Sequence, residues 1–136
     1  MDRLHQALVR ERGPAVLALV IRIVAGGLFV AISLGKFFDH ATEAHDFARY
    51  GVAFPAVAVT VVGIVELLGG LALIVGLGTR IAAALLAATM VGAIATAGRV
   101  EGGTFNLGVA PALLVLMLIV LWTGPGTCSL DRRLDR

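Results

Sequence analysis

Long apolar stretches alternate with short polar ones along most of this chain. The apolar stretches cover residues 14–38, 55–77, 80–99 and 104–123, and few charges lie inside them. At about 1.5 Å per residue, a helix over each stretch is long enough to cross the ~30 Å hydrocarbon layer of a membrane. The pattern therefore predicts an all-α protein. We expect a single integral membrane domain over residues 1–136, built as an antiparallel bundle of four transmembrane helices.

The polar segment between the first and second spans predicts a shorter helix. Within residues 41–50, Ala44, Phe47 and Ala48 fall on one side and charged residues fall elsewhere, which is the pattern of an amphipathic helix. Gly51 is suited to end this helix, because glycine readily adopts the left-handed conformation found at helix ends. Five aromatic residues around this segment predict an aromatic belt at one membrane interface: Phe37, Phe38, Phe47, Tyr50 and Phe54.

Small residues at four-residue spacing predict where helices pack closely. Two such series occur, one in the first span and one in the third: Gly27, Ala31 and Gly35, and Ala84, Ala88, Gly92 and Thr96. A ladder of small residues lets two helix backbones approach each other. We expect the first series to contact another helix and the third span to be buried among its neighbours.

Composition agrees with a membrane protein and narrows its partners. Of the 136 residues, 59% are hydrophobic and only 15% are charged, and the mean hydropathy is +0.97, which is too apolar for a typical soluble domain. The net charge is +2 and no basic stripe with interleaved aromatic residues occurs. The expected partner is therefore the lipid bilayer and not a nucleic acid. Cys128 is the only cysteine, which excludes a disulfide within one chain. The three histidines are not spaced as in a metal or haem site, so we expect no metal and no covalently bound cofactor.

The basic residues predict how the chain is oriented in the membrane. Four spans place both termini on the same side. Seven arginines would lie on that side and three basic residues on the other: Arg3, Arg10, Arg12, Arg80, Arg132, Arg133 and Arg136, against Lys36, Arg49 and Arg99. Because basic residues concentrate on the cytoplasmic side, we expect both the N-terminal and the C-terminal tail to be cytoplasmic.

Two charges inside the apolar spans are the main candidates for a functional site. Arg22 lies roughly 10 Å into the first span, and Glu66 lies roughly 15 Å into the second span from the opposite side. The two side chains would then differ by only a few Å in depth, and a charge in hydrocarbon needs a partner. We therefore expect an Arg22–Glu66 ion pair inside the bundle. Such a pair is either a structural clamp or the lining of a cavity for protons, a quinone head group or another polar ligand.

Three further polar residues could join this site. Ser33 and Lys36 share one face of the first span with Arg22. Lys36 either extends its ammonium to the outer interface or closes the outer mouth of a cavity. Asn106, in the outer half of the fourth span, suits a hydrogen bond to another helix or a contact with a ligand. Threonines within the spans are expected to bond their own backbone.

Five segments are specific enough to indicate a family. They are Arg22, Gly35-Lys-Phe-Phe-Asp39, Phe47-x-x-Tyr-Gly51, the stretch from Gly63 to Arg80 that contains Glu66, and the ending Gly124-Pro-Gly-x-x-Ser-Leu-Asp131. In this order they resemble the DoxX family of small four-span membrane proteins, over nearly the whole chain. The resemblance implies a protein of the bacterial or archaeal cytoplasmic membrane. It also implies an association with quinol oxidase, thiosulfate:quinone oxidoreductase or thiol-redox systems.

The resemblance favours an accessory subunit of a quinone-linked or respiratory redox complex. In this hypothesis Arg22 and Glu66 shape a polar site near a quinone or a lipid, and the partner is a larger membrane redox complex or a second copy of the chain. Two alternatives stay open. One is a stand-alone quinone-linked oxidoreductase of small sulfur compounds, which the lack of a haem, flavin or metal motif in the sequence disfavours. The other is a small transporter or proton pathway that uses Glu66.

Overall fold

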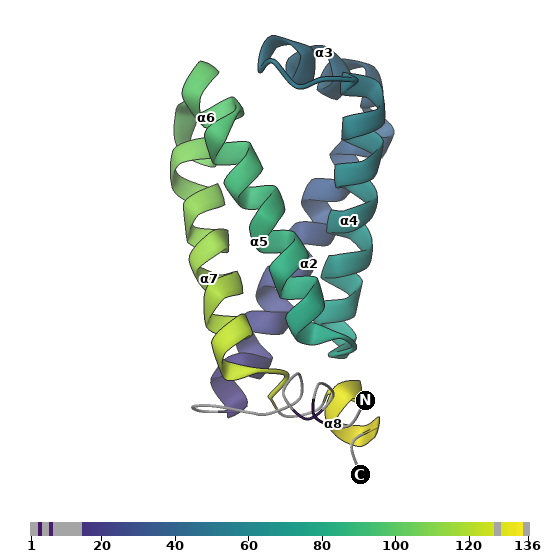
Figure 1. The fold of residues 1–136 in the computed structure, drawn as a ribbon, viewed down its shortest axis with the longest axis vertical. Helices are drawn as coiled ribbons and strands as arrows, with labels where there is room; N and C mark the ends of the chain where they lie inside the picture. The colour runs from purple at the N-terminus through teal and green to yellow at the C-terminus, as the bar shows by residue number, and fades with distance from the viewer. Residues whose placement is uncertain (1–2, 4–5, 7–14, 127–128, 135–136) are drawn as a thin grey trace.

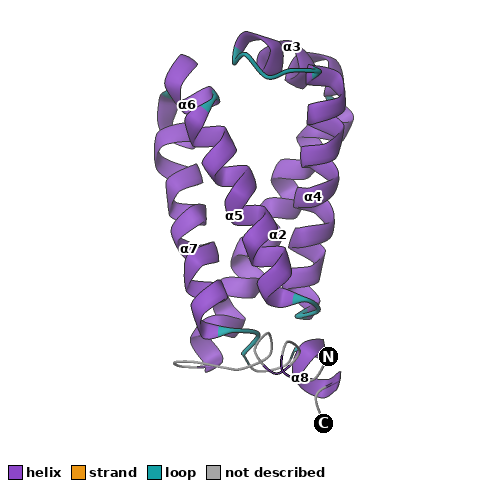
Figure 2. Cartoon of the chain, viewed as in Figure 1, coloured by secondary structure: helices purple, strands orange, loops and turns teal. Residues whose placement is uncertain are grey.

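The computed structural model describes residues 3, 6, 15–126 and 129–134. Four long helical segments run side by side, and a short helix lies across one end (Figure 1). The described residues form helices joined by loops and turns, and none of them forms a strand (Figure 2). The predicted all-α architecture of four spans with a helix between the first two is therefore confirmed. The predicted N-terminal tail lies outside the described residues, except at positions 3 and 6.

Each of the four spans is long and apolar enough to cross a membrane. The first two are α2 (Ala15–Phe38) and α4 (Pro55–Val75). The third is α5 (Thr79–Ala95), followed at once by the short helix α6 (Ala97–Val100), and the fourth is the π-helical turn η1 (Phe105–Val109) followed by α7 (Ala110–Thr123). A short helix, α8 (Leu130–Leu134), comes near the end of the chain. The second span ends before residue 77 because Gly76 adopts a left-handed conformation, with φ of +73°.

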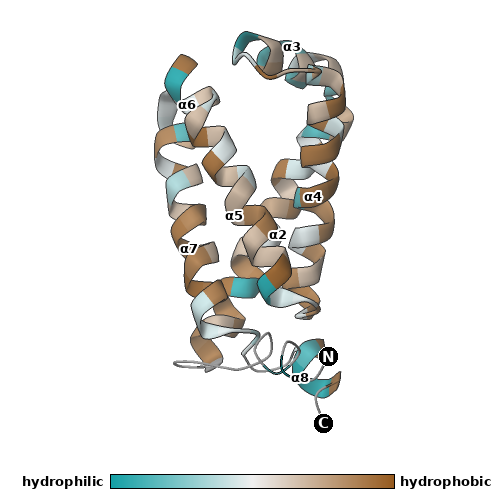
Figure 3. Cartoon of the chain, viewed as in Figure 1, coloured by the Kyte–Doolittle hydropathy of each residue, from teal (hydrophilic) through white to brown (hydrophobic). Residues whose placement is uncertain are grey.

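The outer surface of the bundle is apolar. Hydrophobic residues run along the four spans (Figure 3), and large side chains such as Val20, Leu68, Leu118 and Trp122 are exposed. A surface of this extent would be a liability in water, but it matches the hydrocarbon of a bilayer. The chain is therefore a multi-pass membrane protein.

The helix between the first two spans is α3 (His40–Arg49), which lies across one end of the bundle (Figure 1). It packs against α2 and α4. It ends at Tyr50, and Gly51 then adopts a left-handed conformation with φ of +81°, as the sequence predicted. α3 therefore covers the end of the bundle opposite to α8.

Gly26 of α2 and Gly70 of α4 form a close backbone contact between these two helices. A Cβ atom on either glycine would lie 2.7 Å from the carbonyl oxygen of the other, so neither position has room for a side chain. This contact fixes the register of the two helices. The sequence analysis instead chose the series that begins at Gly27, but a Cβ atom at Gly27 would meet none of the described atoms within 4 Å. That expectation was wrong by one residue.

The small-residue series of the third span does not form the buried face of α5. Ala84, Ala88 and Gly92 are exposed, whereas Leu86 and Met90 are buried. Leu86 packs closely over Gly69, where a Cβ atom would lie 3.0 Å from the leucine side chain. The expectation that the third span would be buried among its neighbours was therefore wrong for the face that carries this series. The buried face carries Leu86 and Met90, whose bulky side chains fill the space between the helices.

Candidate functional site

One face of α2 carries the polar residues that the sequence analysis selected. Arg22, Ser33 and Lys36 are all buried on this face, together with Gly26 and Phe29. Ser33 donates a hydrogen bond of 2.7 Å to the carbonyl of Val30 in its own helix, so its hydroxyl is used locally. The two cations lie near opposite ends of the helix and belong to two different sites.

Arg22 is fully buried at the end of the bundle nearest α8. Its Nε donates a 2.9 Å hydrogen bond to the carbonyl of Leu73, at the end of α4, and its Nη1 donates to the carbonyl of Pro125. Gly76 lies against the guanidinium, since a Cβ atom there would be 2.9 Å from Nη1. Arg22 thus ties α2 to both α4 and the segment that follows α7.

Asp131 fixes the same segment to the turn between α4 and α5. Its carboxylate accepts hydrogen bonds from the backbone N–H groups of Gly78 (2.7 Å) and Thr79 (2.9 Å), at the start of α5. Its own N–H donates to the carbonyl of Gly76 at 2.9 Å. A carboxylate at a helix N-terminus is favourable because it satisfies free N–H groups and the helix dipole. The motif that ends in Asp131 is therefore a structural closure.

The predicted Arg22–Glu66 ion pair is not formed. Because Gly26 packs on Gly70, Arg22 lies beside Leu73 and Gly76. Gly76 is ten residues beyond Glu66 in the sequence, which corresponds to about 15 Å along a helix. The depth estimate failed because it assumed that the two spans begin and end at the same levels. α2 in fact extends beyond the end of α4.

Glu66 pairs instead with Lys36. The Lys36 Nζ lies 3.0 Å from Glu66 Oε2, and the two side chains are 10% and 2% exposed. Lys36 therefore does not extend to the interface, which was one of the two expectations for it. No described group forms a hydrogen bond with Oε2 of Glu66, so the contact is an ion pair without hydrogen-bond geometry. Gly63 leaves room for the lysine stem, since a Cβ atom there would lie 3.3 Å from Lys36 Cβ.

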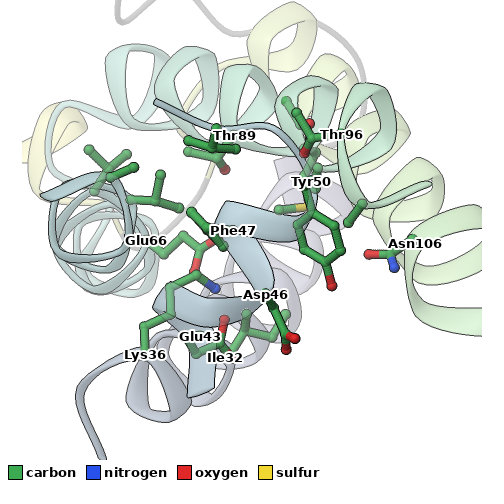
Figure 4. A pocket seen from close by; sticks show the side chains of 18 of the residues that line it. Ile32, Lys36, Glu43, Asp46, Phe47, Tyr50, Glu66, Thr89, Thr96 and Asn106 are labelled. Atoms are coloured by element: carbon green, nitrogen blue, oxygen red, sulfur yellow. The ribbon is translucent and has the colours of Figure 1, made fainter. Parts of the chain in front are cut away.

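A cavity of about 780 Å³ lies beside this ion pair, in the half of the bundle that α3 covers. Its walls come from α2, α3, α4, α5 and η1 and from the connections beside them, and most of the lining residues are apolar. Lys36, Glu66 and Glu43 gather at one end of the lining, and Tyr50 and Asn106 lie toward the other (Figure 4). The arrangement is typical of ligand pockets, which are mostly apolar with a few polar groups.

A polar latch joins α3 to the connection between the third and fourth spans. The hydroxyl of Tyr50 donates a hydrogen bond to Oε2 of Glu101, and Arg49 Nη2 lies 3.4 Å from Oε1 of Glu101. Burial, together with the hydrogen bond to the Glu101 carboxylate, raises the pKa of Tyr50 to about 12. Both Tyr50 and Glu101 line the cavity, so the latch closes one of its sides.

Asn106 also lines the cavity, but it does not bond another helix as expected. Its Nδ2 donates a 2.9 Å hydrogen bond to the carbonyl of Gly102, four residues earlier. The turn at Gly102, where φ is +65°, supplies this nearby carbonyl. Two threonines of the lining also bond their own backbone, as the sequence predicted: Thr89 bonds Leu86 and Thr96 bonds Gly92, each at 2.7 Å.

Four polar residues of the cavity were missed from the sequence: Glu43, Asp46, Tyr50 and Glu101. All four lie in polar connections, where charged residues are usually solvated. The amphipathic pattern of residues 41–50 was an available signal, because a helix with one apolar side must pack that side against something.

Comparison with known proteins places the chain among small membrane proteins. The DoxX family model matches residues 17–99. The uncharacterized membrane protein Rv3486 of Mycobacterium tuberculosis is 32% identical over 143 residues, which covers 95% of this chain and 87% of that protein. A Bacillus subtilis protein named "Putative oxidoreductase CatD" is 35% identical over 78 residues, or 57% of each chain. No solved structure matches.

Proposed function

This chain belongs to the DoxX family, and we propose that it is a membrane-embedded accessory subunit of a quinone-linked redox complex. In this proposal it binds a quinone in the cavity beside Lys36 and Glu66. The observation that supports the proposal is a cavity of about 780 Å³ between the span helices and α3, with a buried ion pair in its wall. A volume between about 300 and 1,000 Å³ is the usual size of a small-molecule site.

The chemistry of the cavity suits a lipophilic molecule with a compact polar head. Aliphatic residues such as Val61, Val62 and Leu85 offer contacts to an isoprenoid or acyl tail. Lys36 and Glu66 offer a donor and an acceptor to a head group. An intramembrane ion pair beside an open volume is costly, so it favours a binding role over a merely structural one.

The accessory role rests on the sequence and on one relative. The chain has one cysteine and so cannot form an internal disulfide, and no haem, flavin or metal motif occurs in the sequence. Electrons to or from a bound quinone would therefore pass through a partner protein of the bacterial or archaeal cytoplasmic membrane. The oxidoreductase name of the Bacillus subtilis relative supports a redox setting.

Quinone binding can be tested by extraction. Wild-type protein purified in mild detergent should carry quinone in its lipid extract, and variants Lys36→Met and Glu66→Gln should carry several-fold less. Leu68→Ala is the matched control, because Leu68 is on α4 but is 60% exposed and outside the cavity lining. Equal quinone in all four samples, or none in the wild type, would contradict the proposal.

Affinity purification of the same wild-type sample should also recover a redox partner. Recovery of the chain alone would favour transport, and recovery of copies of the chain would indicate a homo-oligomer.

Two other functions make different predictions. A proton pathway or transporter would need Glu66 to change its protonation state, so Glu66→Gln would stay folded and lose transport in reconstituted vesicles. A stand-alone oxidoreductase of small sulfur compounds would turn over quinone with thiosulfate or a thiol in the absence of any partner. We favour the accessory subunit because the cavity fits a bound lipophilic molecule.

The orientation proposal places the α3 side of the cavity outside the cell. It rests on seven arginines, six near the two termini and Arg80 at the start of α5. Reporter fusions at the C-terminus and in α3 would test it. The C-terminal fusion should report a cytoplasmic location and the α3 fusion an external one.

A further inference from the structure

We propose that the cavity selects a head group that donates hydrogen bonds, so that it binds the hydroquinone form in preference to the quinone form. This inference rests on the proposed quinone site and adds which redox state the site holds. It follows from counting the donors and acceptors that the lining residues still have free.

The hydroxyl donors of the lining are used inside the protein. Tyr50 donates to Glu101, Thr89 donates to the carbonyl of Leu86, and Thr96 donates to the carbonyl of Gly92. A hydroxyl has a single hydrogen, so none of these three groups retains a donor for a ligand.

The two nitrogen donors are also engaged, though less completely. Asn106 directs Nδ2 at the carbonyl of Gly102, and no hydrogen bond to its Oδ1 is recorded among the described residues. The charge of Lys36 is held against Glu66 at 3.0 Å. The ammonium keeps hydrogens that could reach a ligand, but the adjacent carboxylate offsets its charge.

The acceptors, in contrast, are in excess. Four carboxylates and one ammonium line the cavity among the described residues: Glu43, Asp46, Glu66 and Glu101, and Lys36. Oε2 of Glu66 is buried and lies 3.0 Å from Lys36 Nζ, without the geometry of a hydrogen bond. Asp46 and Glu101 each lie within ion-pair distance of Arg49, so Glu43 is the carboxylate of the lining that has no ion pair among the described residues. Glu43 lies beside Glu66 and Lys36 at the same end of the cavity (Figure 4).

A ligand that carries only hydrogen-bond acceptors would bind unfavourably at this end of the cavity. The carbonyl oxygens of a quinone would face carboxylate oxygens, and Glu66 Oε2 would gain no hydrogen-bond donor from the ligand. The hydroxyl groups of a hydroquinone would satisfy the same oxygen. A protonated amine on an aliphatic tail shares this donor chemistry, so the test must separate the two.

The experiment compares four probes with the same decyl tail on purified full-length protein in lipid nanodiscs, under anaerobic reducing conditions for the reduced probe. The probes are the decyl hydroquinone, its quinone, its dimethyl ether and decylamine, and binding is measured by equilibrium dialysis. We expect the hydroquinone to bind at least about tenfold more tightly than the quinone and the ether, because one added hydrogen bond to a charged acceptor is worth about that factor. In Glu66→Gln the preference should shrink or invert, because the amide supplies its own donor. Leu68→Ala should keep the wild-type order.

Each outcome bears on one claim. If the quinone or the ether binds as tightly as the hydroquinone, the proposed preference for hydrogen-bond donors is wrong, while binding of a quinone-type molecule is still supported. If only decylamine binds, the preference for donors holds and the proposed quinone site is wrong. If no probe binds, both fail. The wild-type comparison decides the matter even if Glu66→Gln does not fold.

Discussion

The two ends of α2 accommodate a buried cation in opposite ways. Arg22 is held by backbone carbonyls of Leu73 and Pro125 at an end of the bundle that is closed by the C-terminal segment. Lys36 faces one carboxylate whose Oε2 has no hydrogen bond, beside an open cavity. A buried charge surrounded by matched groups rigidifies a structure, whereas an unmatched polar group beside a cavity is available to a ligand. The contacts at the first end are structural, and the proposed binding site lies at the second end.

Arg22→Met should have the largest effect on stability. The substitution leaves two buried carbonyl groups without their donor and releases the segment that α8 follows, so we expect a loss of about 3 kcal/mol or more in unfolding free energy. The loss would be measured as a lower thermal midpoint in detergent. Arg99→Met, at an exposed position of α6, is the control and should change little. An unchanged thermal midpoint for Arg22→Met would contradict a structural role for Arg22.

Gly26→Ala should come next, and it has a matched control one residue away. The added methyl group would lie 2.7 Å from a backbone oxygen of α4 that cannot move independently. We expect destabilisation by about 1–3 kcal/mol, as overpacking usually causes. Gly27→Ala adds the same methyl group into open space and should be neutral or slightly stabilising. Equal midpoints for the two variants would mean that this contact does not set the register.

These two glycines show where prediction from the sequence ended. The hydropathy pattern predicted the four spans, and the spacing of Arg22, Ser33 and Lys36 predicted their shared face, which the structure shows to be buried. Which residue of α4 faces which residue of α2 depends instead on one close backbone contact. Gly26 and Gly27 are equally plausible in a one-dimensional pattern. Without this contact the relative levels of the two spans had to be assumed, and the depth estimate then gave the wrong partner for Glu66.

The cavity was harder to predict for a different reason. Its polar residues come from segments that are far apart in sequence, such as Tyr50 and Glu101, which meet only because α3 folds back over the bundle. Lys36 and Glu66 were recognised as candidates because charges within apolar spans are rare. The sequence around Glu101 looks like that of an ordinary solvated loop, so it does not predict the contact between Glu101 and Tyr50.

A double substitution at the cavity should separate stability from binding. Lys36→Met alone leaves the Glu66 carboxylate without its cation, and we expect a loss of about 1 kcal/mol, because the cavity leaves room for water beside the carboxylate. Adding Glu66→Leu removes the unpaired charge and should restore the thermal midpoint, while ligand binding stays lost. If the double variant binds quinone normally, the ion pair is not part of the binding site.

The latch between Tyr50 and Glu101 should have the smallest effect on stability and a distinct effect on titration. Tyr50 is the only tyrosine, so the tyrosinate absorbance of the whole protein reports this residue alone. Its pKa is raised from 10.0 to about 12 in the folded protein, which means that folding favours the protonated phenol. The stabilisation is therefore fully present below pH 10 and is lost as the pH rises from about 10 toward 12.

Glu101→Gln removes the carboxylate that accepts the phenol hydrogen and should move the midpoint of the absorbance titration toward 10. Glu43→Gln, in α3 but outside the latch, should leave the midpoint near that of the wild type. Identical titrations for wild type and Glu101→Gln would show that α3 is not held to the opposite side of the cavity in this way.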